Sequence, residues 1–243
     1  MLTKLHDQVE QLRLRGIAES LDEVLAEAQR EGQATQDVLS RLLEVEWNYQ
    51  QTRTLENRIK NAKLPYPWTL ETFPFEEQPN INKVQIMDLA KLDFIRRHEN
   101  IVLIGKPGTG KTGLAVGLLR LALINGYRCR FYNAQELLDE LYASLADRTT
   151  SKLLKRIANY DLITIDELGY LTLNKEQINI FFKLIEMRYQ NKPTIITTNL
   201  EYDDWYKVFE DKSLVEAMQD RFKHFCTTIK IDGASLRVPK ENS

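Results

Sequence analysis

Near its middle the chain reads Gly105-Lys106-Pro107-Gly108-Thr109-Gly110-Lys111-Thr112. The apolar run IVLIG, residues 101–105, leads into this stretch, and an apolar helical pattern over Gly113–Asn125 follows it. A strand, a glycine-rich turn and a helix in this order form a P-loop, in which backbone N–H groups at the start of the helix surround a phosphate. The stretch therefore predicts a nucleotide-binding α/β fold.

The P-loop supplies most of the predicted nucleotide contacts. We expect the Lys111 ammonium to reach the β- and γ-phosphates of ATP and the Thr112 hydroxyl to hold Mg²⁺. A chance glycine turn before a helix is the alternative, which the strand and helix on either side disfavour. The predicted nucleotide-binding residues are Gly105, Lys106, Pro107, Gly108, Thr109, Gly110, Lys111, Thr112 and Gly113.

A second apolar strand, residues 162–165, ends in Asp166 and Glu167. A second carboxylate at the end of a buried strand is costly unless something uses it. We expect Asp166 to bind Mg²⁺, directly or through water, and Glu167 to polarise the water that attacks the γ-phosphate. One strand-helix unit separates this strand from the P-loop strand, so another strand can insert between them in the sheet.

Three more polar residues are candidates for the same site. Asn199 ends the apolar strand PTIITTN, and ligands of parallel sheets bind at the carboxyl ends of strands, so it is expected to help place the water. Arg221 in AMQDRF is a candidate for a neighbouring subunit's γ-phosphate, and Arg237 in GASLR for the nucleotide of its own subunit. The alternatives are an ordinary turn for the asparagine and solvated or salt-bridged side chains for the arginines.

From residue 83 onward, apolar strands alternate with helical patterns. A helix over Val84–Arg97 comes first, and the strands are IVLIG, YRCRFYNA, DLITID, PTIITTN and CTTIKID. This alternation predicts a doubly wound parallel sheet. We therefore assign residues 83–243 to an ATPase domain.

Residues 1–63 have helical periodicity and no strand signal. Apolar residues recur at three- and four-residue steps, Gly32 breaks the pattern, and Thr35 is a candidate N-cap for a second long helix that Pro65 and Pro67 end. We assign 1–63 to a small all-helical domain and 64–82 to an extended linker. The linker aromatics are expected to anchor it on the next domain: Trp68, Phe73 and Phe75.

Composition narrows the class of protein. The chain has 243 residues and a formal net charge of -2, so any DNA-binding surface must be a local patch. Its two cysteines, Cys129 and Cys226, exclude a disulfide framework, and three histidines without a CxxC pair leave no zinc cluster. The charged N-terminus is not a signal peptide, and the stretch Gly113–Gly126 is too short to span a bilayer, so we expect no membrane association and a cytoplasmic protein.

Two groups of basic residues are candidates for DNA contact. One closes the long N-terminal helix, where cations also stabilise the helix C-terminus, and the other lies just before the Asp-Glu strand. Contacts to phosphates would give sequence-independent binding that weakens with salt. The two groups are Arg53, Arg58, Lys60 and Lys63, and Arg148, Lys152, Lys155 and Arg156.

The ordered set GKPGTGKT, LITIDELGYL, TIITTN, MQDRF and GASLR resembles the DnaA/DnaC/IstB branch of AAA+ ATPases. The segments LRLRGIAESLDEVLAEA, TLENRIKNAKLP, LETFPFEEQPNINK and EYDDWYKVFEDKSLVEAMQDRF look like the IstB type, the helper ATPase of insertion-sequence transposition. The likeness covers nearly the whole chain. Lys106 and Gly113 depart from the expected proline and histidine, and neither departure removes a phosphate ligand.

This resemblance implies roles that composition does not show. Arg221 matches an arginine finger acting in trans, and Arg237 matches the sensor-2 arginine. The resemblance also implies an AAA+ fold, ATP and Mg²⁺ as cofactors, homo-oligomers on double-stranded DNA, and recruitment and stimulation of a partner transposase. An extra helical element that faces the DNA in this branch corresponds to about Glu136–Tyr160.

Two other functions remain as alternatives. A DnaC-like replicative helicase loader would act on single-stranded DNA; some loaders carry an N-terminal cysteine cluster, and this chain has no cysteine before Cys129. A metabolic P-loop kinase is disfavoured because Asp166, Glu167 and Asn199 suit activation of water rather than phosphoryl transfer to a small molecule.

Overall fold

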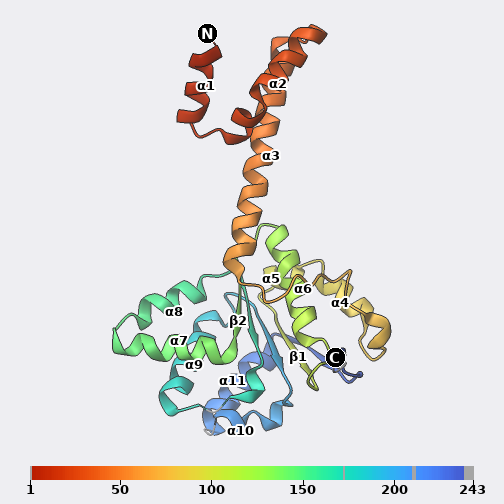
Figure 1. Ribbon diagram of the computed structural model, residues 1–243. Coiled ribbons are helices and arrows are strands. Elements are labelled where there is room, and N and C mark those ends of the chain that lie inside the picture. Colours follow the sequence, from red (N-terminus) through yellow and green to blue (C-terminus); the bar gives the residue numbers. More distant parts are fainter. Residues whose placement is uncertain (1, 172, 210–211, 238–243) are drawn as a thin grey trace, which may run out of the picture. The chain divides into compact units, whose positions relative to one another are not determined.

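The computed structural model describes residues 2–171, 173–209 and 212–237 of the chain. The chain divides into two compact units, Met1–Arg58 and Ile59–Ser243 (Figure 1). The segment expected as a linker, residues 64–82, lies within the second unit. None of the helices in the described ranges is long and apolar enough to cross a membrane.

The first unit is helical, as expected. It contains α1 (Leu2–Gln11), α2 (Arg15–Glu31) and most of α3 (Thr35–Ala62). Gly32 ends α2 in the left-handed conformation, with φ of 66°. Because the Ala34 carbonyl accepts from Val38 N–H at 3.2 Å, Ala34 stands at the start of α3 where we expected Thr35 to be the cap. The helical pattern before Gly32 forms two helices rather than one. Arg13 adopts a left-handed conformation, which lets α1 fold back so that Val9 packs with Ile17 and Leu21 of α2.

Close packing of α2 on α3 explains one glycine of this unit. A Cβ at Gly16 would lie 2.7 Å from Tyr49 Cβ, closer than real Cβ atoms approach one another. Beside it, the buried Glu46 carboxylate accepts from Ile17 N–H at 3.1 Å and from Gln50 Nε2 at 2.8 Å. A carboxylate of α3 thus satisfies a donor in the first turn of α2, where no side chain of α2 itself caps the helix.

The second unit contains a five-stranded sheet in which every pair is parallel. The strand order is β2-β3-β4-β1-β5, so β4 lies between the P-loop strand and the Asp-Glu strand. The doubly wound parallel sheet and the inserted strand are therefore confirmed. The strands are β1 (Asn100–Gly105), β2 (Cys129–Asn133), β3 (Leu162–Asp166), β4 (Thr194–Thr198) and β5 (Cys226–Ile231).

Helices cover both faces of the sheet (Figure 1). Alternate side chains of β1 point to opposite faces: Ile101 and Leu103 pack with the first group of helices below, Val102 and Ile104 with the second. The first group is α4 (Lys83–Leu89), α5 (Asp93–Arg96) and α6 (Lys111–Ile124). The second is α7 (Ala134–Ala146), α8 (Thr150–Ala158), α9 (Lys175–Arg188), α10 (Tyr206–Phe209) and α11 (Lys212–His224). Short 3-10 turns occur at Phe75–Glu77, Leu168–Tyr170 and Tyr202–Asp204.

The expected single helix over Val84–Arg97 is wrong. Leu92, with φ of 63°, interrupts it and separates α4 from α5. Leu92, at this break, and Phe94, just beyond it, are buried in the core on the α6 side of the sheet. Helical periodicity alone does not register a one-residue reversal of this kind.

The aromatic residues of the 64–82 segment anchor it to this core. Phe73 is only 4% exposed, and Trp68 and Phe75 are partly buried against the same cluster. Phe73 packs edge-on to Phe75 with ring centroids 4.9 Å apart. Trp68 also explains a departure in the P-loop, because a Cβ at Gly113 would lie 3.0 Å from its Cε3.

Candidate nucleotide-binding site

A cavity of about 760 Å³ opens at the carboxyl ends of the strands, where β1 passes through the P-loop into α6. It brings together residues of both predicted motifs, the tail after β5 and the segment before α4. Its wall includes Lys63, Pro65, Tyr66, Trp68, Pro107, Gly108, Gly110, Lys111, Thr112, Gly113, Phe131, Asn133, Glu136, Asp166, Glu167, Thr198, Asn199, Leu236 and Arg237. This volume and mixed lining are those of a small-molecule site.

The P-loop conformation needs its glycines. Gly108 and Gly110 have φ of 82° and 94°, in the left-handed region that other residues adopt at a cost. A side chain at Gly108 would overlap Ser235, and a Cβ at Gly110 would lie 2.7 Å from Phe73 Cε2. The tail is tied to the loop by Leu236 N–H, which donates to the Gly108 carbonyl at 2.8 Å.

Lys111 is held inside the loop. Its Nζ donates to the carbonyls of Gly105 and Lys106, both at 2.8 Å. Burial lowers the pKa of Lys111, and the nearby carboxylates of Asp166 and Glu167 only partly oppose this. A bound polyphosphate adds the negative charge that favours the ammonium form, so the lysine is placed to pair with phosphate oxygens.

Asp166 lies at the end of β3 and faces two hydroxyl groups. Thr112 Oγ1 donates to its two carboxylate oxygens at 2.9 and 3.1 Å, and Thr197 Oγ1 donates to Oδ1 at 2.5 Å. Burial raises the pKa of Asp166, although both hydroxyl bonds lower it. A carboxylate beside a P-loop hydroxyl is an oxygen donor set that suits Mg²⁺, which would complete its shell with phosphate and water oxygens.

Glu167 is the first residue after β3 and adopts a left-handed conformation, with φ of 64°. Its backbone N–H donates to Thr197 Oγ1 at 2.9 Å, and its Oε2 accepts from Asn133 Nδ2 at 3.3 Å. The side chain is exposed to the cavity, as a group that polarises water must be. Asn133 was not among the residues expected at this site, although it is a polar residue at the end of the apolar strand β2.

Asn199 also lines the cavity, just beyond β4. Its Oδ1 is buried and has no hydrogen-bond partner within the described ranges. The Cα of Gly169 lies against this oxygen so closely that a Cβ there would overlap it. A buried acceptor without a donor is costly, and a water molecule bound against it would supply one.

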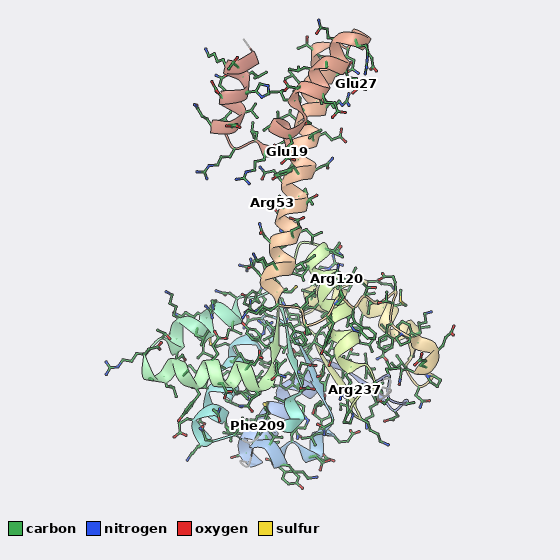
Figure 2. The ribbon with its side chains drawn as sticks, in the orientation of Figure 1. Glu19, Glu27, Arg53, Arg120, Phe209 and Arg237 are labelled. Carbon is green, nitrogen blue, oxygen red and sulfur yellow. The ribbon has the colours of Figure 1, made fainter. Side chains whose placement is uncertain are left out.

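The two candidate arginines occupy different places. Arg237 lines the cavity and contributes to the field at Lys111. Figure 2 labels it on the segment that follows β5. Arg221 is not part of the cavity wall; its guanidinium lies over the Phe182 ring at 4.8 Å and 3.7 Å from Glu186 Oε1. The structure therefore brings Arg237 to the site of its own chain and leaves Arg221 on the surface of α9.

The basic residues before β3 lie on the α7–α8 hairpin. Arg148, in the turn, has φ of 59°, and it is exposed together with Lys152, Lys155 and Arg156. Arg156 pairs with Glu140 at 2.7 Å. Their exposure on one short element permits contact with a polyanion.

The four residues of the other predicted basic group differ in exposure and in location. Arg53 is exposed and lies 3.8 Å from Glu56, and Arg58 is half-buried. Lys60 is exposed, and Lys63 lines the nucleotide cavity. Lys63 thus lies at the cavity rather than only on an outer helix face.

Arg188, which the sequence analysis did not single out, holds α8 to the sheet. It is 2% exposed, and its guanidinium donates to the carbonyls of Ile157, Ala158 and Tyr160 at 3.2, 3.1 and 2.9 Å. It also donates to Thr194 Oγ1 at 3.0 Å and to the Pro193 carbonyl. One side chain therefore satisfies the last carbonyls of α8 and the start of β4.

Comparison with known proteins identifies the family of this chain. The family pattern described as IstB-like ATP binding protein matches residues 7–243. A protein of insertion sequence IS21 from Pseudomonas aeruginosa, whose name describes it as ATP-binding, is 34% identical over 95% of this chain and 87% of its own length. A similarly named protein of insertion sequence IS232 from Bacillus thuringiensis subsp. berliner is 33% identical over 97% of this chain and 94% of its own.

Solved structures with the same fold include DnaI, with a TM-score of 0.59 and 20% identity over 68% of this chain and 91% of that one. The DnaC helicase loader has a TM-score of 0.57 and 24% identity over 70% of this chain and 99% of that one. AMPPCP-bound DnaA from Aquifex aeolicus has a TM-score of 0.59 and 20% identity over 70% and 51%. The likeness establishes an AAA+ P-loop fold.

Proposed function

The chain belongs to the IstB-like family of ATP-binding proteins, within the AAA+ ATPases, and we propose that it hydrolyses ATP while assembled on duplex DNA and recruits a partner transposase. One observation carries the chemical part of this proposal. Lys111, Thr112, Asp166, Glu167, Asn199 and Arg237 come from separate parts of the sequence and meet in one cavity.

Each of these groups has a role that its position supports. Lys111 binds the β- and γ-phosphates. Thr112 and Asp166 would hold Mg²⁺, which would neutralise phosphate charge. Glu167 accepts a proton from, or orients, the attacking water. Asn199 places that water, and Arg237 stabilises the negative charge that develops on the γ-phosphate.

The surface residues support assembly and DNA binding. Because Arg221 lies outside the cavity of its own chain, a role at a γ-phosphate requires a neighbouring copy. The exposed cations of the α7–α8 hairpin suit contacts to DNA phosphates without base reading. The acidic first unit, with 7 Lys and Arg against 11 Asp and Glu over residues 1–58, suits a protein partner better than DNA, although Arg53 and Arg58 remain candidates for DNA contact.

Transposase is the proposed partner because the relatives are named as proteins of insertion sequences. The second candidate function is a helicase loader on single-stranded DNA. The similarity of this fold to those of DnaI and the DnaC helicase loader is the observation that favours it. The two functions differ in the form of DNA on which the protein assembles.

Light scattering after size-exclusion chromatography tests the proposal. The protein is mixed with a short random duplex or the corresponding single strand, each with ATP or ADP. A large species that requires both ATP and duplex is expected. Assembly on single strands alone would favour the helicase loader, and a protein that stays monomeric in all four mixtures would contradict both functions.

A further inference from the structure

Thr197 lies near the carboxyl end of β4, and it is not part of the wall of the nucleotide cavity. It is fully buried in β4, the strand between β3 and β1. The ladder between β3 and β4 ends with the pair Ile165 and Ile196. One residue further along, the Thr197 side chain takes over the connection between these strands.

The Thr197 hydroxyl donates one hydrogen bond and accepts another. Its single proton goes to Asp166 Oδ1 at 2.5 Å, a length typical of an O–H donor on a carboxylate. Its oxygen accepts the backbone N–H of Glu167 at 2.9 Å. A single hydroxyl thus connects the predicted Mg²⁺ ligand to the predicted water-polarising residue.

The two bonds restrict different degrees of freedom. The bond to Asp166 fixes the χ2 torsion of that side chain and keeps Oδ1 directed toward β4. The bond to Glu167 holds its backbone at φ of 64°, a conformation that is unfavourable for a residue with a side chain. Without the acceptor, Glu167 loses the contact that opposes its return to an ordinary backbone conformation.

Thr112 does not duplicate this function. It also donates to Asp166, and its lone pairs remain free for Mg²⁺, but among the described residues no hydrogen bond joins it to Glu167. Thr197 contacts both acids and is not part of the cavity wall. Thr197 therefore keeps its two contacts in the nucleotide-bound protein.

We propose that Thr197 is a positioning residue that aligns Asp166 and Glu167 for ATP hydrolysis through the two hydrogen bonds of its hydroxyl. This inference rests on the proposed roles of the two acids. It assigns Thr197 no contact with ATP, Mg²⁺ or the attacking water. Removing the hydroxyl should lower kcat and weaken the response to Mg²⁺ while leaving the binding of metal-free nucleotide unchanged.

The sheet offers a matched control. Thr164 is fully buried on the neighbouring strand β3, and its hydroxyl has no hydrogen-bond partner in the part of the chain that the structure describes. Thr164→Val and Thr197→Val make the same chemical change on adjacent strands. Only the second removes bonds to the two acids.

The test measures ATP hydrolysis in the presence of duplex DNA across a Mg²⁺ titration, together with binding of ATP in EDTA. For Thr197→Val we expect kcat to fall by about 10- to 100-fold, as for other residues that orient a metal ligand, and half-saturation to need more Mg²⁺. Thr197→Ser should stay within about threefold of the parent, because it keeps the hydroxyl. Thr164→Val should match the parent, and metal-free ATP should bind all variants alike.

Wild-type kcat and Mg²⁺ dependence in folded Thr197→Val would overturn the inference. If that variant does not fold, Thr197→Cys, with a weaker donor in similar volume, must show the fall in kcat, and a parent-like rate would also overturn it. Glu167→Gln separates this result from failure of the proposed function. Undiminished hydrolysis by Glu167→Gln would remove the proposed role of Glu167. If Glu167→Gln loses hydrolysis while Thr197→Val hydrolyses ATP at the parental rate, only the inference about Thr197 is rejected.

Discussion

The hydroxyl of Thr112 donates to both carboxylate oxygens of Asp166, across 54 residues of sequence. This contact joins the start of α6 to the end of β3. It occurs where burial raises the pKa of Asp166 above its usual value of 3.8. The ionised carboxylate is therefore less favourable in the folded nucleotide-free protein than in the unfolded chain.

Replacing Asp166 by Asn should stabilise the protein without nucleotide. A carboxyl group with a raised folded-state pKa contributes most stability below its unfolded pKa, and this contribution is lost as pH rises through the folded value. At pH 7 Asp166 thus carries a cost that the neutral amide of the variant would not, while the amide oxygen still accepts from Thr112. We expect the melting temperature to rise by about 2 to 4 °C for each kcal/mol recovered.

The same substitution should abolish most of the extra stabilisation that Mg²⁺ adds to ATP binding. Thermal melts with no ligand, ATP in EDTA, and ATP with Mg²⁺ measure both effects. Glu136→Gln is the control, because it removes an exposed carboxylate from the same cavity wall. A lower melting temperature for unliganded Asp166→Asn would contradict the argument.

Gly169 should be intolerant of even a methyl group. A Cβ there would overlap Asn199 Oδ1 and lie 3.0 Å from Thr198 Oγ1, so Gly169→Ala should displace the Asn199 side chain. We expect kcat for ATP hydrolysis to fall by about tenfold, with ATP affinity nearly unchanged, because only the placement of water is disturbed.

A double-mutant cycle checks the cause. If Gly169→Ala acts through Asn199, adding it to Asn199→Ala should lower kcat little further. Additive losses in the double variant would mean that Gly169 acts by another route.

The P-loop and the sheet were predictable because their signals are local. Apolar runs of strand length and the glycine spacing around Lys111 each lie within a few consecutive residues. Polar residues at strand ends then predicted the positions of Asp166 and Asn199 at one edge of the sheet. The cavity contains both, together with Arg237.

Residues that act through distant hydrogen bonds were not predictable in this way. Thr197 reads as one of several strand threonines, and its contact with Glu167 spans 30 residues. Arg188 looks like a basic residue in the last turn of a helix, an ordinary stabilising position. Its buried guanidinium is satisfied by carbonyls of α8, which only the tertiary structure brings to it.

Arg188→Met should strongly destabilise the second unit. Methionine keeps most of the aliphatic volume but leaves the carbonyls of Ile157, Ala158 and Tyr160 without this donor. The Ile157 carbonyl keeps the N–H of Tyr160, at 3.3 Å. Since each of the other two, left unsatisfied, costs about 1 to 3 kcal/mol, the free energy of unfolding should fall by about 2 kcal/mol or more. Urea denaturation followed by circular dichroism measures this change.

Arg128→Met is the matched control for that experiment. Arg128 also donates to a carbonyl after α8, that of Asn159, but its side chain is 66% exposed. Its replacement should cost no more than about 1 kcal/mol. Equal urea midpoints for the Arg188 variant and the parent would show that the buried guanidinium contributes no net stability.

Removing Lys152, Lys155 and Arg156 together should weaken DNA binding without affecting ATP binding. Loss of three phosphate contacts should reduce the slope of log K against log salt by about 2 to 3. Fluorescence anisotropy with a labelled duplex at several salt concentrations measures the slope. Replacing Lys91, Arg96 and Arg97 by Ala removes the same charge from exposed positions elsewhere, and an equal loss of affinity there would reject the α7–α8 assignment.

Arg221 should act on the nucleotide of a neighbouring copy. Within its own chain it lies against Phe182 and Tyr189, outside the cavity that holds Lys111. Arg221→Ala should therefore bind ATP normally and hydrolyse it at least about 10³-fold more slowly in the assembled state, as for other arginine fingers. Glu167→Gln should also be inactive, but its Arg221 remains intact.

Mixing these two inactive variants on DNA separates a trans role from a structural one. A Glu167→Gln subunit can supply Arg221 to an Arg221→Ala subunit whose own cavity is complete. Random assembly in equal amounts places an intact arginine beside an intact cavity at about one interface in four, so about a quarter of parental ATP hydrolysis should return. A mixture as inactive as its components would contradict the trans assignment, because neither defect could then be complemented by its neighbour.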